Sequence, residues 1–218
     1  MSQDLPNSSA APAFSAGKKS ERTKQKLIDA VGKLLAEKGF MAIGVNAVAK
    51  QAGVDKVLIY RYFGGLNGLM AKYAESSDFW PTATEIIGDE IELQAIKQKP
   101  FSQQMIYFMN RYLAALLSRP LTQEILAWET VVTNEFTPIL EEVREQLGRE
   151  LMTALRPKHI SDAELAAVST VFVAAINYLV VRSRKIKNFN GINLQSDSGW
   201  QELMGTMEKM VSAFDAGE

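Results

Sequence analysis

AIGVNAVAKQAGVDKVLIYRYFGGLNGL, residues 42–69, carries the clearest structural pattern in this chain. Two short helical patterns flank a turn at Ala52-Gly53-Val54, where glycine accepts the positive φ that a tight inter-helix turn needs. The first pattern places four small apolar residues on one face: Val45, Val48, Ala49 and Ala52. The spacing therefore predicts a helix-turn-helix.

The second pattern runs through Phe63 and predicts a helix that Asp55 caps, because a carboxylate oxygen accepts a hydrogen bond from a free first-turn amide. Phe63 and either Leu58 or Ile59 are expected to be buried. The side chains that stay available for a partner are basic or aromatic: Lys56, Tyr60, Arg61 and Tyr62. This combination is typical of a helix that reads DNA.

A longer helix is expected before the motif, over residues 20–38. Its apolar stripe consists of Leu27, Ile28, Val31, Leu34 and Leu35. Gly39 stops this helix, and Phe40 returns the chain to the core. Residues 1–17 are small, polar and proline-containing, without the features of a signal peptide, and are expected to form a disordered tail.

Charge divides the chain sharply although the formal net charge is only −1. Residues 18–75 carry a balance of +6 and residues 76–218 a balance of −6. This division predicts that the basic amino-terminal part binds DNA phosphates, while the acidic remainder of the chain does not. Chance clustering on a solvated helix is the alternative.

Composition excludes several classes of chemistry. The 218 residues include no cysteine, so disulfides, thiolate zinc sites and cysteine nucleophiles are absent. The one histidine, His159, follows Pro157-Lys158 in an apparent loop, and no metal-ligand cluster or phosphate-binding glycine loop accompanies it. We therefore expect no catalytic residues, no metal and no cofactor, and hence a protein that is not an enzyme.

The string from Val45 to Tyr62, closed by Phe63 and Leu69, resembles the amino-terminal domain of TetR-family transcriptional regulators. The resemblance covers residues 20–75, and beyond them it concerns the architecture only. It implies an all-α dimer in which a three-helix DNA-binding domain precedes a larger helical domain for ligand binding and dimerisation. Members commonly repress transcription until a small molecule binds in the carboxy-terminal domain.

The resemblance also implies the DNA contacts. The second short helix enters the major groove, where Lys56 donates to guanine and Val57 or Leu58 meets a thymine methyl group. Asn46 matches a position that also reaches bases. Tyr60 and Tyr62 are assigned to the phosphates, the alternative being that their rings only pack the domain, and Arg61 is a further DNA-binding candidate.

Two departures from the family pattern concern phosphate binding. Gly44 stands where members usually carry threonine, so it offers only backbone donors. Leu66 replaces the lysine commonly found three residues after the phenylalanine, and glycines make the turn around it flexible. Backbone amides at a helix amino terminus bind phosphate without a side-chain cation and are the expected substitute.

The body is expected to contain helices over about 101–118, 121–134 and from Thr137-Pro138 to about 155, after a loop or short helix between Trp80-Pro81 and Lys99-Pro100. An effector cavity between helices is predicted from these residues: Tyr107, Phe108, Met109, Tyr112 and Trp128, with Arg111 and Glu129 as polar groups that orient a ligand. An ordinary core stripe, with the two charged residues at its boundary, is the alternative.

The last two helices favour self-association. Ser161 and Glu164 form a capping box, and Leu165 to Val181 is apolar nearly all round, so this helix must be buried on most sides. A second capping box is predicted at Ser198–Gln201, followed by a stripe from Trp200 to Phe214. Two such helices per subunit form a four-helix bundle across a two-fold axis, in which Asn177 is a candidate for fixing the register.

The sequence thus predicts an all-α, cytoplasmic homodimer with three segments: a disordered tail (1–17), a helix-turn-helix DNA-binding domain (18–65) and a helical effector-binding and dimerisation domain (66–218). The expected partners are double-stranded DNA with a palindromic operator and a small-molecule effector, with no membrane association. The expected function is a repressor whose operator binding the effector relieves. The alternative is a helical ligand-binding or adaptor protein whose DNA-binding domain is degenerate, as Leu66 suggests.

Overall fold

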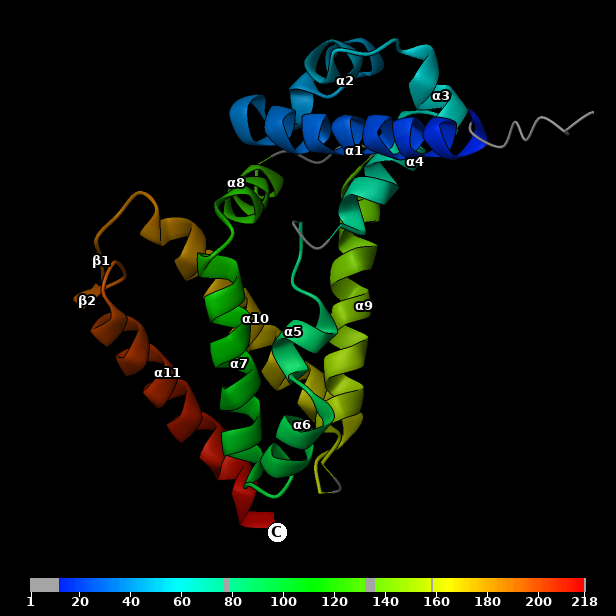
Figure 1. The fold of residues 1–218 in the computed structure, drawn as a ribbon. Helices are drawn as coiled ribbons and strands as arrows, with labels where there is room; N and C mark the ends of the chain where they lie inside the picture. The colour runs from blue at the N-terminus through cyan, green and yellow to red at the C-terminus, as the bar shows by residue number, and fades with distance from the viewer. Residues whose placement is uncertain (1–11, 77–78, 132–135, 158, 218) are drawn as a thin grey trace, which may run out of the picture. The chain divides into compact units, whose positions relative to one another are not determined.

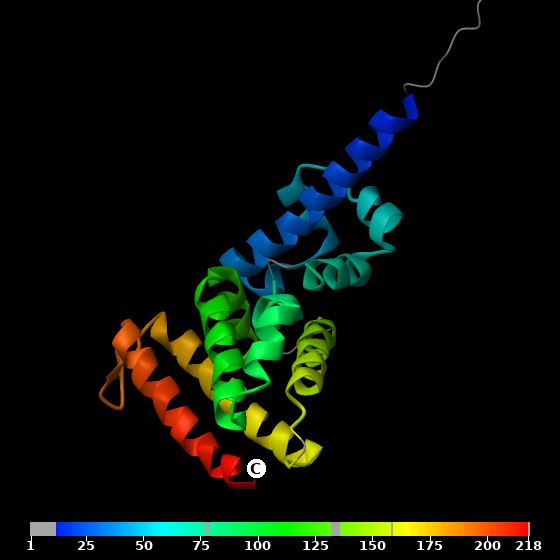
Figure 2. The same cartoon turned by 60° about the horizontal axis from the view of Figure 1, so that its bottom comes forward.

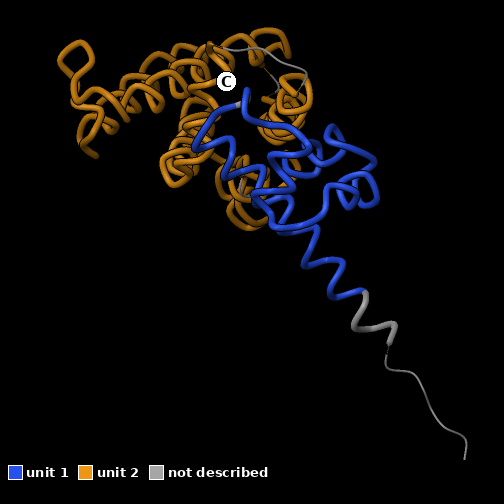
Figure 3. Tube along the Cα trace, turned by 90° about the horizontal axis from the view of Figure 1, so that it is seen from above, with its two compact units in different colours: residues 1–73 blue, residues 74–218 orange. Residues whose placement is uncertain are grey.

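The computed structural model describes residues 12–76, 79–131, 136–157 and 159–217. Within these ranges the chain forms eleven α-helices, two short 3-10 helices and one two-stranded ribbon, which confirms the all-α prediction. Figure 1 shows how the labelled helices follow one another along the chain. The chain divides into two compact units, Met1–Tyr73 and Ala74–Glu218, coloured separately in Figure 3. The compact amino-terminal unit therefore extends beyond residue 65, to Tyr73.

The amino-terminal unit is built from four α-helices and one 3-10 helix: α1 (Pro12–Lys38), η1 (Phe40–Ala42), α2 (Val45–Ala52), α3 (Val57–Phe63) and α4 (Leu66–Ala74), whose last residue falls in the second unit. The expected α1 stripe is buried apart from Ile28, which is half-buried. Gly39 ends α1 at φ 71°, as predicted. The backbone of residues 12–17 is helical, so that part of the expected tail is wrong, and residues 1–11 lie outside the described residues.

The carboxy-terminal unit starts with two short helices, where a loop or a short helix was expected before residue 100: α5 (Ala83–Ile87) and α6 (Glu90–Ile96). Thr82 caps α5, and Asp89 with Glu92 forms a capping box on α6. The central helix α7 (Phe101–Leu117) follows, and its apolar stripe is buried: Phe101, Met105, Phe108, Met109, Tyr112 and Leu116. It contacts α5, α8, α10 and α11, so α7 is the core helix of this unit.

Two helices carry the chain on from α7: α8 (Pro120–Glu129) and α9 (Thr137–Leu155). The bounds of α9 match the prediction, whereas α8 ends earlier than expected. Its buried face consists of Ile125 and Leu126 with two polar residues, Thr122 and Gln123, while Trp128, predicted for the effector cavity, is only half-buried. The polar pair is accommodated because Thr122 Oγ1 donates to Phe79 O (2.5 Å) and Gln123 Nε2 to Leu116 O (2.8 Å).

The chain ends with α10 (Asp162–Ser183), a ribbon of β1 (Asn188–Phe189) and β2 (Ile192–Asn193), α11 (Asp197–Val211) and the 3-10 helix η2 (Ser212–Gly217). The Ser161–Glu164 capping box is confirmed. The cap of α11 is Ser196, whose hydroxyl accepts from Gly199 N, and the predicted cap at Ser198 is wrong. In Figures 1 and 2, α11 runs along α7, and these two helices contact each other.

The ribbon was not predicted. Asn190 at φ 49° and Gly191 at φ 88° form its turn, the Asn-Gly pair that two-residue hairpins favour. Phe189 packs edge-on against Tyr178 of α10, with ring centroids 5.9 Å apart. The ribbon, which connects α10 to α11, therefore packs against α10.

The sequence of α10 was expected to be buried on most sides, and within one chain it is not. In the described part of the chain, α10 is the one helix that is long and apolar enough to cross a membrane. This is weak evidence, because core helices of soluble proteins have the same length and composition. Leu165, Phe172 and Ile176 are buried, whereas Val171 is 63% and Tyr178 52% exposed. An apolar face of α10 is thus left open in the single chain.

Candidate DNA-reading helix and effector cavity

The turn between α2 and α3 has the geometry of a helix-turn-helix. Gly53 takes the left-handed conformation (φ 65°, ψ 38°), donates its N–H to Lys50 O and so closes α2. Asp55 Oδ1 then accepts from Val57 N at 2.8 Å and caps the start of α3, as predicted. Of the two residues considered for the buried face of α3, Ile59 is the fully buried one, and Leu58 and Phe63 are half-buried.

The outward face of α3 carries the residues predicted to read DNA. Val57 is 60% and Tyr60 57% exposed, and Lys56 and Arg61 are also exposed. Residues 57, 60 and 61 share one face because they are three and four positions apart on a helix. Asn46 is exposed in the first turn of α2. An apolar and cationic surface is therefore presented by a helix that is anchored through Ile59.

Tyr62 lies between two cations. Lys24 Nζ of α1 and Arg61 Cζ each lie 5.8 Å from the centre of its ring, within the range of cation–π contact. The ring is half-buried, which agrees with packing of the domain, and its phosphate contact remains a prediction.

The two departures from the family pattern flank this surface. Gly44 is the N-cap of α2, has an extended backbone and makes no side-chain cap. Leu66 is half-buried and opens α4 after Gly64 and Gly65, at φ 74° and 132°. Gly68 is required sterically, because a Cβ there would lie 1.8 Å from Phe63 O. The close approach of α4 to the end of α3 therefore depends on glycine.

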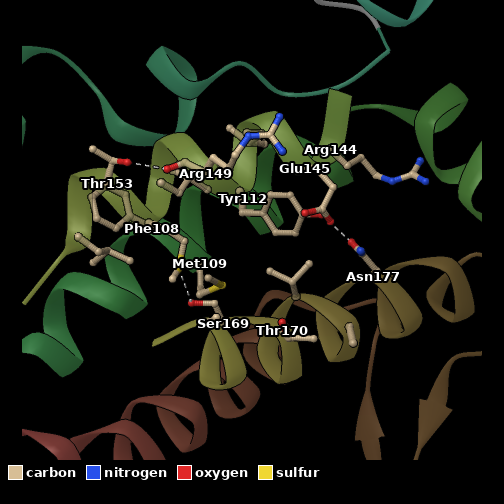
Figure 4. A pocket seen from close by; sticks show the side chains of 18 of the residues that line it. Phe108, Met109, Tyr112, Arg144, Glu145, Arg149, Thr153, Ser169, Thr170 and Asn177 are labelled. Carbon is tan, nitrogen blue, oxygen red and sulfur yellow. Dashed lines mark hydrogen bonds between the residues drawn. The ribbon is translucent and has the colours of Figure 1, made fainter. Parts of the chain in front are cut away.

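A cavity of about 770 Å³ lies in the carboxy-terminal unit between α7, α9 and α10. Figure 4 shows Phe108, Met109 and Tyr112 of α7 facing Ser169, Thr170 and Asn177 of α10, with Arg144, Glu145 and Arg149 of α9 at the margin. Its volume falls in the range of small-molecule sites, about 300–1,000 Å³. The apolar part of the lining also includes Trp80, Leu147, Leu151, Met152, Leu155 and Val173.

One end of the cavity holds a connected polar group. Tyr112 Oη donates to Asn177 Oδ1 at 2.8 Å, and the Tyr112 ring lies 6.0 Å from that of Trp80. Burial raises the pKa of the Tyr112 hydroxyl, although the Asn177 hydrogen bond and the charge of Arg144 act in the opposite direction. Tyr112 is therefore a neutral hydrogen-bonding group.

Arg144 connects this end of the cavity to α8. Its guanidinium stacks over Trp80 (5.6 Å from Cζ to the ring centre), and Nη1 donates to Glu129 Oε2 at 2.8 Å. Burial raises the pKa of the Glu129 carboxyl, outweighing the opposite effect of Arg144. Sequence reasoning did not select Arg144, and no local signal distinguishes it from the other charged residues of α9.

Three of the seven predicted effector residues line the cavity: Phe108, Met109 and Tyr112. Tyr107 and Arg111 lie on another face of α7, where Arg111 donates to Tyr107 Oη, Glu85 O and Glu92 Oε1 and so ties α7 to α5 and α6. Trp128 is half-buried and does not line the cavity. Glu129 does not line it either, but it forms an ion pair with Arg144, which does. Asn177, considered for the dimer register, is a cavity residue.

Comparisons with known proteins agree with this architecture. Residues 27–72 match the family model of bacterial regulatory proteins of the tetR family. No curated protein sequence matches the chain. Solved structures with the same fold include NalD of Pseudomonas aeruginosa, the secondary repressor of the MexAB-OprM multidrug efflux pump, with 16% identity over 88% of this chain and 96% of that chain and a TM-score of 0.58.

Two further structures have the same fold at similar identity. BioQ of Mycobacterium smegmatis is 17% identical over 89% of this chain and 99% of its own, with a TM-score of 0.56. The regulator FadR of Bacillus subtilis, solved with stearoyl-CoA, is 16% identical over 89% of this chain and 98% of its own, also with a TM-score of 0.56. The likeness extends over both units, beyond the segment that the family model matches.

The chain thus has a helix-turn-helix unit and a larger all-helical unit, the architecture of the solved structures named above. Residues 27–72 therefore match the segment that TetR-family regulators share, and the solved structures show the same fold over the rest of the chain, which together support a TetR-family regulator.

Proposed function

We propose that this protein is a sequence-specific operator-binding repressor whose DNA affinity falls when a small molecule occupies the cavity between α7, α9 and α10. The observation that carries the proposal is the exposed face of α3, with Lys56, Val57 and Tyr60 presented from a helix that Ile59 anchors. This face belongs to residues 18–75, whose balance of charge is +6. A cationic surface of this kind is attracted to DNA phosphates.

The proposed contacts divide into base readout and phosphate binding. Lys56 donates to guanine O6 or N7, Val57 and Leu58 meet thymine methyl groups, and Asn46 reaches a base from α2. Tyr60, Arg61 and Tyr62 hold phosphates, together with the backbone amides that follow Gly44. The exposure of Val57, Tyr60 and Arg61 on one face supports this division.

Self-association is proposed through α10 and α11. Val171 and Tyr178 on α10 are exposed apolar residues in the single chain, as is Met210 on α11, which is 62% exposed. Two helices from each copy would bury these residues in a four-helix bundle across a two-fold axis. A two-fold dimer binds a palindromic site whose half-sites are about one helical turn of DNA, or a multiple of it, apart.

Relief by an effector is supported by the cavity and by what is known of proteins with this fold. NalD is named as a repressor, and FadR of Bacillus subtilis was solved with stearoyl-CoA. The cavity of this chain has a volume suited to a small molecule and a mostly apolar lining. We propose a cytoplasmic, non-catalytic regulator that uses no cofactor.

A second candidate function is a ligand-binding or adaptor protein that has lost DNA affinity. Leu66 favours it, because this residue occupies the position of the usual phosphate-binding lysine and is half-buried. The amides at the start of α4 are the groups that must replace the lysine if DNA binding is retained.

Selection of bound duplexes from a random DNA pool by the purified protein, at low and at moderate salt, tests the two functions. Enrichment of one palindrome at both salt concentrations is the expected result. A folded dimer that enriches no sequence at either salt concentration would favour the adaptor function. The selected operator then allows a search for compounds that release it.

A further inference from the structure

Arg144 lines the cavity and also connects α9 to α8. It lines the cavity together with Trp80, Tyr112 and Asn177, and its Nη1 binds Glu129, the last residue of α8. The Arg144 side chain is 22% exposed and that of Glu129 10%, so this is a largely buried ion pair. A ligand that engages Arg144 therefore acts directly on a contact of α8.

The cavity end beside Arg144 offers three hydrogen-bond donors that have no acceptor in the described part of the chain, while Glu145 and Asp162 are the carboxylates of the lining. Apart from Nη1, the guanidinium N–H groups of Arg144 have no partner among the described residues. The Asn177 amide accepts from Tyr112 Oη through Oδ1, and its Nδ2 group has no acceptor in the described part of the chain. Trp80 Nε1 is buried and is likewise unpaired within the described ranges. This donor set is suited to a ligand oxygen.

The partner of Arg144 on α8 is incompletely satisfied. Glu129 Oε1 is buried and has no hydrogen-bond partner among the described residues, so its only polar contact there is Arg144 through Oε2. Burying a carboxylate with a single partner carries a desolvation cost that the ion pair offsets only in part, so a better acceptor can compete for Arg144 if Glu129 regains solvent when α8 is released. A ligand carboxylate can accept two parallel hydrogen bonds from a guanidinium, whereas Glu129 accepts one.

We propose that the effector is an apolar molecule ending in a carboxyl-derived oxygen acceptor, and that this acceptor replaces Glu129 as the partner of Arg144, releasing the end of α8 from α9. The inference rests on the proposed effector function of the cavity. Phe108, Met109 and Met152 contact the apolar body, and Asn177 Nδ2 donates to the acceptor oxygen. Exchange of a partner, with no new charge on the protein, is the event that binding produces.

The ligand class is tested with four probes of equal chain length: decanoate, decanamide, 1-decanol and decylammonium. Dissociation constants are measured with the purified full-length protein from the concentration dependence of its melting temperature. Decanoate or decanamide is expected to bind at least tenfold more tightly than 1-decanol and decylammonium, and the better of the two shows whether the acceptor is anionic or neutral. Tighter binding of decylammonium, or equal binding of all four, would overturn the assignment.

Three variants test the role of Arg144. Arg144→Gln is expected to weaken binding of the preferred probe at least tenfold, and Glu129→Gln to tighten it severalfold because the competing carboxylate is removed. Arg184→Gln is the control, since Arg184 also pairs with a residue of α8, Glu124, but lies outside the cavity lining. Arg144→Lys keeps the positive charge but lacks the parallel N–H donors of the guanidinium. It is expected to give a dissociation constant between those of the wild type and Arg144→Gln, which distinguishes weaker ligand recognition from unfolding of the protein. Equal binding by Arg144→Gln and Arg184→Gln would refute the proposal.

Release of α8 has its own readout in hydrogen exchange of peptides that cover residues 120–129. The preferred probe is expected to raise exchange near Glu129 in the wild type, and Arg144→Gln is expected to show the raised exchange without ligand. Unchanged or slowed exchange of these peptides on binding would contradict the exchange of partners. Neither measurement involves DNA, so failure of operator binding and failure of this inference are observed separately.

Discussion

Asp215 binds Ser102 through both of its carboxylate oxygens, with Oδ1 accepting from the Ser102 backbone N–H at 2.8 Å and Oδ2 from its hydroxyl at 2.5 Å. Ser102 lies in the first turn of α7, where free amides need acceptors, so a residue near the carboxyl end of the chain caps the core helix of the carboxy-terminal unit. Phe214 supports the contact, since its ring packs against Phe101 and its carbonyl lies 3.1 Å from His159 Nε2.

Removal of this cap is expected to destabilise the carboxy-terminal unit. Asp215→Ala should lower the free energy of unfolding by about 1–2 kcal/mol, the usual range for loss of a helix cap. Urea titration followed by circular dichroism measures the change. Glu202→Ala, which removes an exposed carboxylate of α11 with no polar partner among the described residues, is the control and should shift the midpoint little.

The glycine at the start of α4 is expected to be irreplaceable. Gly68→Ala would place a Cβ 1.8 Å from Phe63 O, so the end of α3 and the start of α4 must move apart. A loss of about 1–3 kcal/mol is expected for such overpacking. Gly205→Ala in α11 meets open space and should instead stabilise its helix by roughly 0.5–1 kcal/mol. Thermal melts of both variants check the prediction, and a neutral Gly68→Ala would contradict it.

Base readout and phosphate binding by α3 are expected to respond differently to substitution. Lys56→Ala should cost about 1–3 kcal/mol at its preferred base and relax the preference there. Tyr60→Phe should weaken binding to all sequences alike, because a phosphate contact carries no sequence information. Titration of the selected operator and of single-base variants separates the two effects. If neither substitution changes binding, the residue assignment is wrong even though the fold is right.

The buried carboxyl of Glu129 is expected to make stability depend on pH. Burial raises its pKa in the folded protein, so the folded state holds this proton more tightly than the unfolded chain does. Its contribution is therefore most favourable below the ordinary carboxyl pKa of the unfolded chain and is lost as the pH rises through the raised folded pKa. The difference in melting temperature between Glu129→Gln and the wild type should increase in favour of the variant from pH 4 to pH 7. A constant difference over this range would contradict the assignment.

The open face of α10 is expected to hold the dimer together. Val171→Glu places a charge on a residue that is 63% exposed in the single chain and should shift the protein to monomers, since an unpaired charge is costly in an apolar interface. Ile91→Glu on α6 is the matched control, because Ile91 is 81% exposed and lies outside the proposed interface. Sedimentation velocity distinguishes the two outcomes, and a dimeric Val171→Glu would exclude this face.

Local pattern was sufficient for the amino-terminal unit and for most helices. The α1 stripe, the Gly53 turn and the Asp55 cap depend on residues a few positions apart, and all three agree with the structure. The Asn190-Gly191 hairpin carried an equally local signal that was overlooked. Ser196, not Ser198, caps α11, because the preceding strand fixes where the helix starts.

The helix-turn-helix, the division of charge between the two parts of the chain and the boundaries of α7, α9 and α10 follow from local sequence patterns, because periodicity and capping act within a few turns. The face of α7 that meets the cavity, which separates Tyr112 from Arg111, became known only from the packed fold, as did the contacts of Arg144 with Glu129 and of Asp215 with Ser102. Those contacts depend on how the helices cross, which follows from the packing of many side chains at once and leaves no signal at any single position.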